Sequence, residues 1–301
     1  MTIPALGPLT ELAARSIRRL PVGRQRLLRR LIRVPKFYAK LPGSRGLSFE
    51  VDRTDLMPWG VFCTGEYERR ETALLLGLLR EGDTFVDVGA NWGYFTLLGA
   101  EKVGPKGRVV AIEADPRNHA LLAGNVQRNR LTQVSAIHAA AGSAAGVLAL
   151  VGYHEGQANR GVSYVRGTTP TGGQGRMIEG AGQAIEVRGD TVDALLDEVG
   201  VGRADLLKMD IEGAEALALP GMLAGLRAGR YRKILIELHA NVLIEYGVDS
   251  RGLMAILTDS GYRLWSIGPE SLEVVAPGAL IPGRSELLAI APGEPDPAMK
   301  T

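Results

Sequence analysis

Short apolar runs alternate with stretches of helical spacing along most of the chain. Five runs rich in branched aliphatic residues have the length of buried strands and lie at 85–88, 108–113, 134–138, 204–209 and 233–239. Two further runs, at 262–267 and 285–290, have no helical stretch between them and predict an antiparallel hairpin. The pattern therefore predicts an α/β fold with a doubly wound, mostly parallel seven-stranded sheet that ends in this hairpin.

The chain before this sheet predicts a smaller helical unit. Residues 9–32 mix leucine and isoleucine with arginine and are interrupted at Pro21, which predicts two short amphipathic helices. A short strand is expected at 47–51, followed by a helix at 72–79. We therefore treat residues 1–45 as a basic helical extension of the α/β domain.

Glycine is concentrated in one segment of the predicted α/β domain, which spans residues 46–292. Residues 152–189 contain ten glycines and are too polar to build a core. A long irregular insertion in a compact domain is usually functional or disordered, and we expect 168–182 to be mobile. The proline-containing tail, 293–301, is expected to be flexible.

Composition narrows the class of protein. The chain has 301 residues, of which 46% are hydrophobic, as is typical of a globular protein with an ample core. Its single cysteine, Cys63, excludes an intramolecular disulfide and a cysteine-rich metal site. No apolar stretch approaches the roughly 20 residues of a membrane span, and arginines interrupt the N-terminal apolar residues, unlike a signal peptide. We therefore expect a cytoplasmic protein.

The net charge of +2 conceals an asymmetry. Residues 1–45 hold nine arginines and two lysines against one acidic residue, Glu11, a net charge of +10, so the remainder carries −8. Three interpretations stay open: a solvated face of helices that pack on the α/β domain, a surface that contacts anionic lipid or an acidic carrier-bound substrate, and a lid over an acceptor site. Arginines and aromatic residues do not alternate over any sustained stretch, so nucleic-acid binding is not expected.

The turn after the first predicted strand carries the clearest chemistry. Gly89 and Gly93 allow a ligand to approach the backbone, and the helix that follows points its N–H groups at that ligand. A dinucleotide fingerprint would read Gly-x-Gly-x-x-Gly. Here Asp87 precedes the first glycine and Asn91 takes the place of the middle one. A carboxylate at this position suits a cationic amino group better than a pyrophosphate.

Two more carboxylates end predicted strands. Glu113 ends the strand at 108–113, where it can accept both hydroxyls of a ribose, and Asp210 follows the strand at 204–209. Because open α/β sheets bind ligands at the carboxyl ends of their strands, these two residues and Asp87 are expected to converge on one site. An amino acid at one end and a nucleoside at the other, without phosphate, describe S-adenosylmethionine.

Several segments resemble the FkbM-type methyltransferases, a branch of the class I S-adenosylmethionine-dependent enzymes. The resemblance covers roughly residues 60–290 and rests on Gly-Glu-Tyr-Glu at 65–68, Asp-Val-Gly-Ala-Asn-Trp-Gly at 87–93, Ile-Glu-Ala-Asp-Pro at 112–116, Leu-Lys-Met-Asp-Ile-Glu-Gly-Ala-Glu at 207–215 and Ile-Leu-Ile-Glu-Leu at 234–238. It implies a Rossmann-like class I methyltransferase fold. It also implies O-methylation of a small hydroxylated acceptor, such as a natural product or a sugar.

The motifs and the resemblance together give a set of candidate site residues. The residues expected to contact the cofactor are Glu68, Asp87, Gly89, Ala90, Asn91, Gly93, Tyr94, Glu113, Ala114, Asn118, Ala140, Ala141, Asp210 and Glu212. Asp87 and Asp210 are assigned to the methionine end, Glu113 to the ribose, and the small residues Ala140 and Ala141 to the adenine. The residues expected to contact the acceptor are Tyr67, Asn159, Arg160, Ser163 and His239.

Transfer to an alcohol is assisted by a base that removes the hydroxyl proton. The candidates are His239, Asp210 and Glu237, with His239 as the sharper hypothesis and a structural histidine as its alternative. Glu237 and His239 lie two apart on one strand and so point the same way. Asp210 and Glu237 could also hold Mg²⁺, but the sequence offers no clear third ligand, and no metal site is predicted.

Two other functions stay open at this point. A nicotinamide-dependent dehydrogenase is disfavoured by Asp87, by Asn91 and by the terminal hairpin. A non-catalytic cofactor-binding scaffold could recruit a partner through the basic N-terminus. The expected partner is a small hydroxylated molecule, while contact with a membrane surface and a homodimer are left open.

Overall fold

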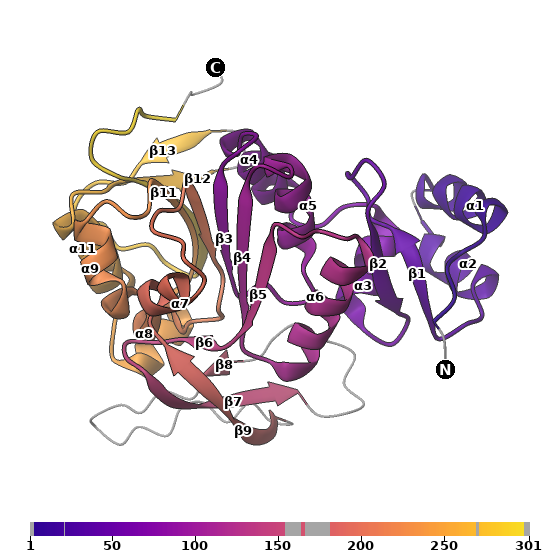
Figure 1. Ribbon diagram of the computed structural model, residues 1–301, viewed down its shortest axis with the longest axis horizontal. Coiled ribbons are helices and arrows are strands. Elements are labelled where there is room, and N and C mark those ends of the chain that lie inside the picture. The colour runs from indigo at the N-terminus through magenta and orange to yellow at the C-terminus, as the bar shows by residue number, and fades with distance from the viewer. Residues whose placement is uncertain (1–2, 21, 154–163, 166–180, 269–270, 298–301) are drawn as a thin grey trace.

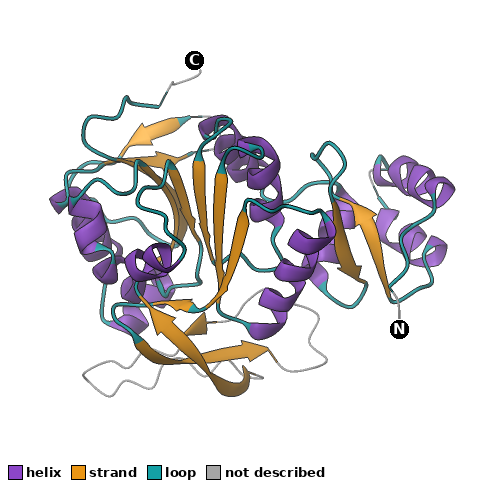
Figure 2. Cartoon of the chain, viewed as in Figure 1, coloured by secondary structure: helices purple, strands orange, loops and turns teal. Residues whose placement is uncertain are grey.

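An eight-stranded sheet forms the centre of the computed structural model, which describes residues 3–20, 22–153, 164–165, 181–268 and 271–297. The strand order is β13-β12-β14-β11-β10-β3-β4-β5, and helices cover both faces (Figure 1, Figure 2). The strands are β3 Thr84–Val88, β4 Arg108–Glu113, β5 Val134–His138, β10 Leu206–Met209, β11 Lys233–His239, β12 Arg263–Ile267, β13 Leu272–Val274 and β14 Arg284–Ile290.

The topology confirms the predicted fold class. Strands β5, β4, β3, β10 and β11 are parallel neighbours, whereas β14 is inserted antiparallel between β11 and β12. The predicted count of seven strands was wrong, because β13 adds an eighth strand at the edge. This strand has only three residues, two of them exposed, so it lacks the apolar run of a buried strand.

The helices begin where the chain supplies the usual capping groups. Helix α6, for example, starts at Pro116, and the Oδ1 of Asp115 accepts from Arg117 N at 2.8 Å and Asn118 N at 3.3 Å. The described helices are α1 Pro8–Arg18, α2 Arg24–Leu31, α3 Leu56–Thr64, α4 Arg69–Leu78, α5 Tyr94–Val103, α6 Pro116–Arg128, α7 Val192–Glu198, α8 Glu215–Gly221, α9 Leu223–Arg227, α10 Ala240–Leu243, α11 Ser250–Asp259 and the 3₁₀ helix η1 Ile244–Tyr246. Within the described ranges, no helix combines the length and apolar character that crossing a membrane requires.

Successive side chains of each strand point to opposite faces of the sheet, so the hydrophobic core has a part on each face. Val86 and Val88 pack into one cluster with residues of α7, α8 and α11, whereas Phe85 packs into the other with residues of α3, α4 and α5. Asp87 lies on the second face, and its register partner on β10 is Lys208. The sheet therefore buries a carboxylate beside an ammonium group on the side of α5.

The N-terminal part confirms the two predicted helices, α1 and α2, and the strand predicted at 47–51, and it adds one more strand. β1 Lys36–Lys40 pairs antiparallel with β2 Ser48–Asp52. β2 was expected, whereas β1 was not, and the predicted boundary at residue 45 falls within this hairpin. The helices lie on the far side of the hairpin from the central sheet (Figure 1).

A second, four-stranded sheet occupies most of the described part of the predicted irregular insertion. Its strands, in the order β6-β9-β7-β8, are β6 Ala140–Ala141, β9 Ala181–Asp190, β7 Gly146–Tyr153 and β8 Tyr164–Val165. The expectation of irregular structure was wrong here, because β9 pairs along its length with the apolar β7, with Val187 opposite Leu148. Of the segment expected to be mobile, 168–180 lies outside the described residues, and 181–182 begin β9.

Candidate active site

A pocket of about 340 Å³ lies at the carboxyl ends of β3, β4 and β10. This is the edge of an open α/β sheet at which ligands bind, and the volume falls within the usual range of about 300–1,000 Å³. The predicted site residues that line it are Tyr67, Glu68, Gly89, Ala90, Asn91, Tyr94, Glu113, Ala114, Asn118, Ala140, Ala141, Asp210 and Glu212. Four other predicted residues, Asp87, Gly93, Glu237 and His239, do not line it, and Asn159, Arg160 and Ser163 lie outside the described residues.

The loop between β3 and α5 forms one wall through an unusual backbone. Gly89, Asn91 and Gly93 have φ values of +83°, +53° and +98°. A Cβ atom on Gly89 would lie 2.0 Å from the carbonyl oxygen of Asp210, so only glycine lets this loop pass against the end of β10. Gly93 is the N-cap of α5, and the first residue of that helix, Tyr94, lines the pocket. The loop thus brings the N-terminus of α5 to the pocket wall.

Glu113 anchors this loop to the end of β4. Its Oε2 accepts from Asn91 N at 2.7 Å and its Oε1 from Asp115 N at 2.7 Å. Each oxygen retains a lone pair for a second donor. Burial raises the pKa of Glu113 to about 7, although both backbone hydrogen bonds lower it.

One region of the pocket is lined by small and apolar side chains. Ala139, Ala140 and Ala141 follow β5, and Ile112 precedes Glu113 on β4. Leu150 of β7 and Val165 of β8 add the second sheet to the wall. This region is apolar and adjoins the Glu113 carboxylate, so it can take a flat ring that is attached to a polar group.

The opposite region is organised by Lys208. Its Nζ lies 3.1 Å from Asp210 Oδ2 and 4.5 Å from the centroid of the Phe95 ring. Burial acts to lower the pKa of Lys208, but the carboxylates of Asp210, Asp87 and Glu68 raise it above its ordinary value. Burial likewise acts to raise the pKa of Asp210, and Lys208 overcomes this and lowers it. Both groups are therefore charged at neutral pH.

Asp87, which was expected to contact the cofactor, lies beneath the pocket. It is 1% exposed, and its Oδ2 accepts from Thr96 Oγ1 at 2.6 Å. Lys208 was missing from the predicted site, although the sequence held a signal for it, namely a lysine inside an otherwise apolar strand run. The structure therefore places the paired Lys208 and Asp210 on the pocket wall and Asp87 beneath it.

Arg284 adds a second cation that sequence reasoning did not find. Its Nη2 donates to Glu237 Oε2 at 2.9 Å and to Glu68 Oε1 at 3.3 Å, and its Nε pairs with the other oxygen of Glu237. Glu68 begins α4 with φ +40°, and burial raises its pKa. Glu237 is held by Arg284 behind the pocket wall, so it is poorly placed to accept a proton from a substrate.

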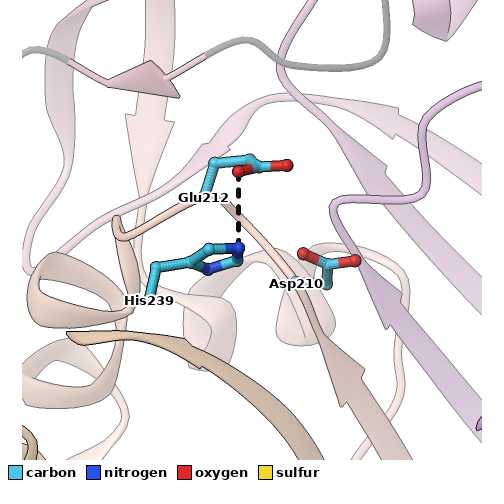
Figure 3. A group of neighbouring side chains, drawn as sticks. All are labelled: Asp210, Glu212 and His239. Atoms are coloured by element: carbon cyan, nitrogen blue, oxygen red, sulfur yellow. Dashed lines mark ion pairs between the residues drawn. The ribbon is translucent and has the colours of Figure 1, made fainter. Parts of the chain in front are cut away.

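Glu212 and His239 form a pair at the edge of the pocket, beside Asp210 (Figure 3). His239 Nε2 lies 3.4 Å from Glu212 Oε2 and 3.7 Å from Glu237 Oε1. Burial and the neighbouring Asp210 raise the pKa of Glu212 to about 7, whereas burial lowers the pKa of His239. Glu212 lines the pocket, whereas His239, which was predicted as the base, lies behind it. His239 is therefore linked to the pocket by its contact with Glu212.

The structure offers a candidate third metal ligand beside Asp210 and Glu237, which the sequence did not make clear, and this is Glu68. Among the described residues, two groups have one ligand atom each within 4.8 Å of the others: Asp210 with Glu212 and His239, and Asp210 with Glu68 and Glu237. The sequence did not show the second of these groups because Glu68 precedes α4, far in the chain from Asp210. The nearby Lys208 and Arg284 already neutralise Asp210 and Glu237.

The chain matches a known protein family. A family model for the methyltransferase FkbM domain matches residues 87–264. No curated protein matches the chain. The family assignment rests on the first of these findings.

Several solved structures resemble the chain at low sequence identity. The methyltransferase FkbM from Methylobacillus flagellatus KT is 16% identical, with a TM-score of 0.42, and the alignment covers 92% of this chain and 58% of that chain. Aeropyrum pernix fibrillarin, solved with natively bound S-adenosyl-L-methionine, is 17% identical over 73% of each chain, with a TM-score of 0.39. The precorrin-6y C5,15-methyltransferase from Geobacter metallireducens GS-15 is 13% identical over 75% of this chain and 88% of that chain, with a TM-score of 0.40.

Proposed function

Because the chain belongs to the FkbM family of class I S-adenosylmethionine-dependent methyltransferases, we propose that it methylates a hydroxyl group of a small molecule, such as a natural product or a sugar. The observation that carries the choice of a hydroxyl acceptor is the Glu212–His239 pair at the edge of the pocket. An alcohol is a weak nucleophile until its proton is removed, and this pair offers a carboxylate to receive it.

The pocket fits S-adenosylmethionine by the chemistry of its walls. When bound, this cofactor supplies a methyl group activated by a sulfonium cation. Glu113 would hold the ribose hydroxyls through its remaining lone pairs, and the alanines from 139 to 141 would lie against the adenine. Asp210 and Glu68 would accept hydrogen bonds from the amino group of the cofactor, and the first turn of α5, which begins at Tyr94, would receive its carboxylate.

Proton removal is assigned to Glu212, with His239 as a positioning residue. A pKa of about 7 places the Glu212 carboxyl close to the pH at which it can both accept and release a proton. His239 is neutral because burial lowers its pKa, so its imidazole can hold the Glu212 carboxylate by a hydrogen bond without adding charge. The remaining task of the chain is to align the acceptor with the methyl group, which can supply a large part of the rate enhancement.

The proposal is tested by methyl transfer from methyl-labelled S-adenosylmethionine to a panel of sugars, polyols, phenols and amines. We expect label on at least one hydroxylated acceptor, bound through oxygen, and a strong reduction in the Glu212→Gln variant. Transfer only to amines, or equal rates in both proteins, would contradict O-methylation with Glu212 as the base. Parallel reactions with a chelator and with added Mg²⁺ should give equal rates, because Lys208 and Arg284 already supply the positive charge.

The two alternative functions are separated by the same assay. The methyltransferase family match and the antiparallel β14 between β11 and β12 favour methyl transfer over a nicotinamide-dependent dehydrogenase. A non-catalytic scaffold would bind S-adenosylmethionine without transferring its label to any acceptor. Labelled product from the native protein therefore excludes both.

A further inference from the structure

The segment from α1 to the residues just after α2 combines exposed apolar side chains with arginines, and this exposed surface is called the outer face of α1 and α2. Of the thirteen large apolar side chains that are exposed in the described part of the chain, seven lie between residues 9 and 34, and they are Leu9, Leu12, Leu20, Val22, Leu27, Leu31 and Val34. Leu9 and Val22 are 83% and 80% exposed. A concentration of this kind on a short stretch marks an interaction surface, because single exposed apolar residues are normally scattered.

The inner face of the same helices is already used. Ala14, Leu28 and Ile32 are buried in the core cluster that includes α3. Arg18 lies over the ring of Phe62 and Arg29 over that of Trp59, both on α3. The two helices are therefore packed on the core through other residues. The exposed leucines are not needed for this packing and can contact a partner.

Positive charge surrounds these leucines. Arg15, Arg19, Arg26, Arg30 and Arg33 are exposed on or beside the two helices. Leu27 and Leu31 lie one turn apart on α2, as do their neighbours Arg26 and Arg30, so an apolar stripe runs beside a basic one.

A basic groove opens next to α1. It is lined by Arg15, Arg18, Lys40 and Arg45 together with Glu11, whose carboxylate accepts from the backbone N–H of Lys40 at 3.2 Å. Its four cations against one anion suit the phosphate groups of lipid headgroups. The leucines and the groove both belong to the N-terminal unit of α1, α2, β1 and β2. This unit lies at one end of the molecule (Figure 1).

We propose that the outer face of α1 and α2, as defined by the seven apolar residues and five arginines above, docks the protein on an anionic phospholipid bilayer. Helices of 11 and 8 residues with one apolar and basic face suit a position in the plane of the headgroups, with leucines entering the acyl boundary and arginines at the phosphates. A second copy of the chain is a poor occupant, because a symmetric contact would bring two faces of the same high positive charge together. Binding of nucleic acid would not explain the exposed leucines. The nearby aromatic residues Phe37, Phe49, Trp59 and Phe62 are buried, so they cannot stack on bases.

The test is flotation of the full chain with two kinds of vesicle, phosphatidylcholine alone and phosphatidylcholine with phosphatidylglycerol. We expect binding to the anionic vesicles that falls as salt is raised, and at least tenfold weaker binding to the neutral ones. The combined variant Leu12→Gln, Leu27→Gln, Leu31→Gln should lose at least tenfold in binding to the anionic vesicles. Glutamine is a good helix former, so the helices should be retained, and circular dichroism checks this.

A matched control places the same change elsewhere on the surface. Val147, Val274 and Leu280 are 67%, 75% and 60% exposed outside the N-terminal unit, and their replacement by glutamine should leave vesicle binding as in the native protein. Equal binding by the leucine variant and the native protein would overturn the proposal, as would no binding to anionic vesicles. Self-association of the native protein that the leucine variant abolishes would overturn it too, in favour of a second copy as the occupant.

Discussion

At the scale of single residues, the proposed chemistry depends most on Glu212, the proposed base. The structure places this carboxyl on the pocket wall with a pKa of about 7, and it places His239 behind it. A base must be deprotonated to act, so kcat/KM should rise with pH through about 7 and then level off. Glu212→Gln should lower kcat by about 10²–10⁴ and remove this rise, as measured by pH profiles of methyl transfer.

His239→Asn serves as the companion variant. As a positioning residue, His239 should affect kcat less than Glu212 does and leave the midpoint of the pH profile near that of the native enzyme. If His239→Asn abolishes transfer while Glu212→Gln retains it, the histidine is the base and the assignment from the structure is wrong. Binding of S-adenosylhomocysteine by both variants, measured separately, shows whether the cofactor site is intact.

Residue types alone predicted part of this site. The strand-end carboxylates Glu113 and Asp210 could be found because each ends an apolar run. The role of Lys208 was not found, because a lone lysine in a strand is usually a surface residue, and only the register with Asp87 shows that it is buried among carboxylates. Asp87 is buried beneath the pocket because its side chain points to the same face of the sheet as Lys208. Its sequence motif does not indicate this orientation.

At the scale of elements, the turn between β3 and α5 is the most constrained part of the pocket. Gly89→Ala would combine a positive φ with a Cβ atom 2.0 Å from the Asp210 carbonyl oxygen, so β10 or the loop must move. We expect at least about 1–3 kcal/mol of lost stability from backbone strain alone, and weakened cofactor binding. Chemical unfolding together with titration of S-adenosylhomocysteine would measure both.

Gly124→Ala provides the control for this change. Gly124 lies in the exposed part of α6, and a Cβ atom there would meet nothing within 4 Å. Alanine should stabilise the helix by up to about 1 kcal/mol and leave binding unchanged. If Gly89→Ala behaves like this control, the loop is not held as the structure describes.

The elements that sequence predicted best are those buried on both faces. The central parallel strands give nearly continuous apolar runs, which is why β3, β4, β10 and β11 could all be located. β1 and β13 were missed because each is a short edge strand with polar or exposed positions. The run at 147–151 predicts β7, whereas β9 was missed because it contains glycines and only its pairing with β7 shows that it is a strand.

At the scale of the whole molecule, buried carboxyl groups couple stability to pH. Glu215 is 0% exposed, and burial raises its pKa to about 8. The folded state therefore keeps a proton between the ordinary carboxyl pKa and about pH 8 that the unfolded state releases. Unfolding releases that proton in this range, so the free energy of unfolding should fall as pH rises, by up to about 1.4 kcal/mol per pH unit for this group.

Glu215→Gln should remove this contribution and flatten the slope, as measured by urea unfolding from pH 5 to 8. Some slope should remain, because Glu113 behaves in the same way up to a pKa of about 7. Glu81→Gln, at an exposed position, should leave the slope as it is. An unchanged slope in the Glu215 variant would show that its carboxyl is not buried as described.

The arrangement of distant segments was the least predictable feature of the molecule. Arg284 reaches Glu68 and Glu237 because β14 pairs with β11 in a register that puts Arg284 opposite His239. No local pattern around Arg284 indicates this contact. The sequence could therefore predict the sheet and the side of it that binds ligand, whereas the charges behind the pocket wall depend on how the strands pair.

The most direct test of the account is calorimetric titration of the native protein with S-adenosylhomocysteine, with Glu113→Gln and the exposed Glu81→Gln alongside. We expect micromolar binding by the native protein and the Glu81 variant. Binding should be at least about tenfold weaker in the Glu113 variant, because glutamine has one acceptor oxygen where Glu113 has two, and each of these two oxygens already anchors a backbone N–H beside the ribose position. Absence of binding by the native protein, or equal binding by all three, would contradict the claim that this pocket holds the methyl donor.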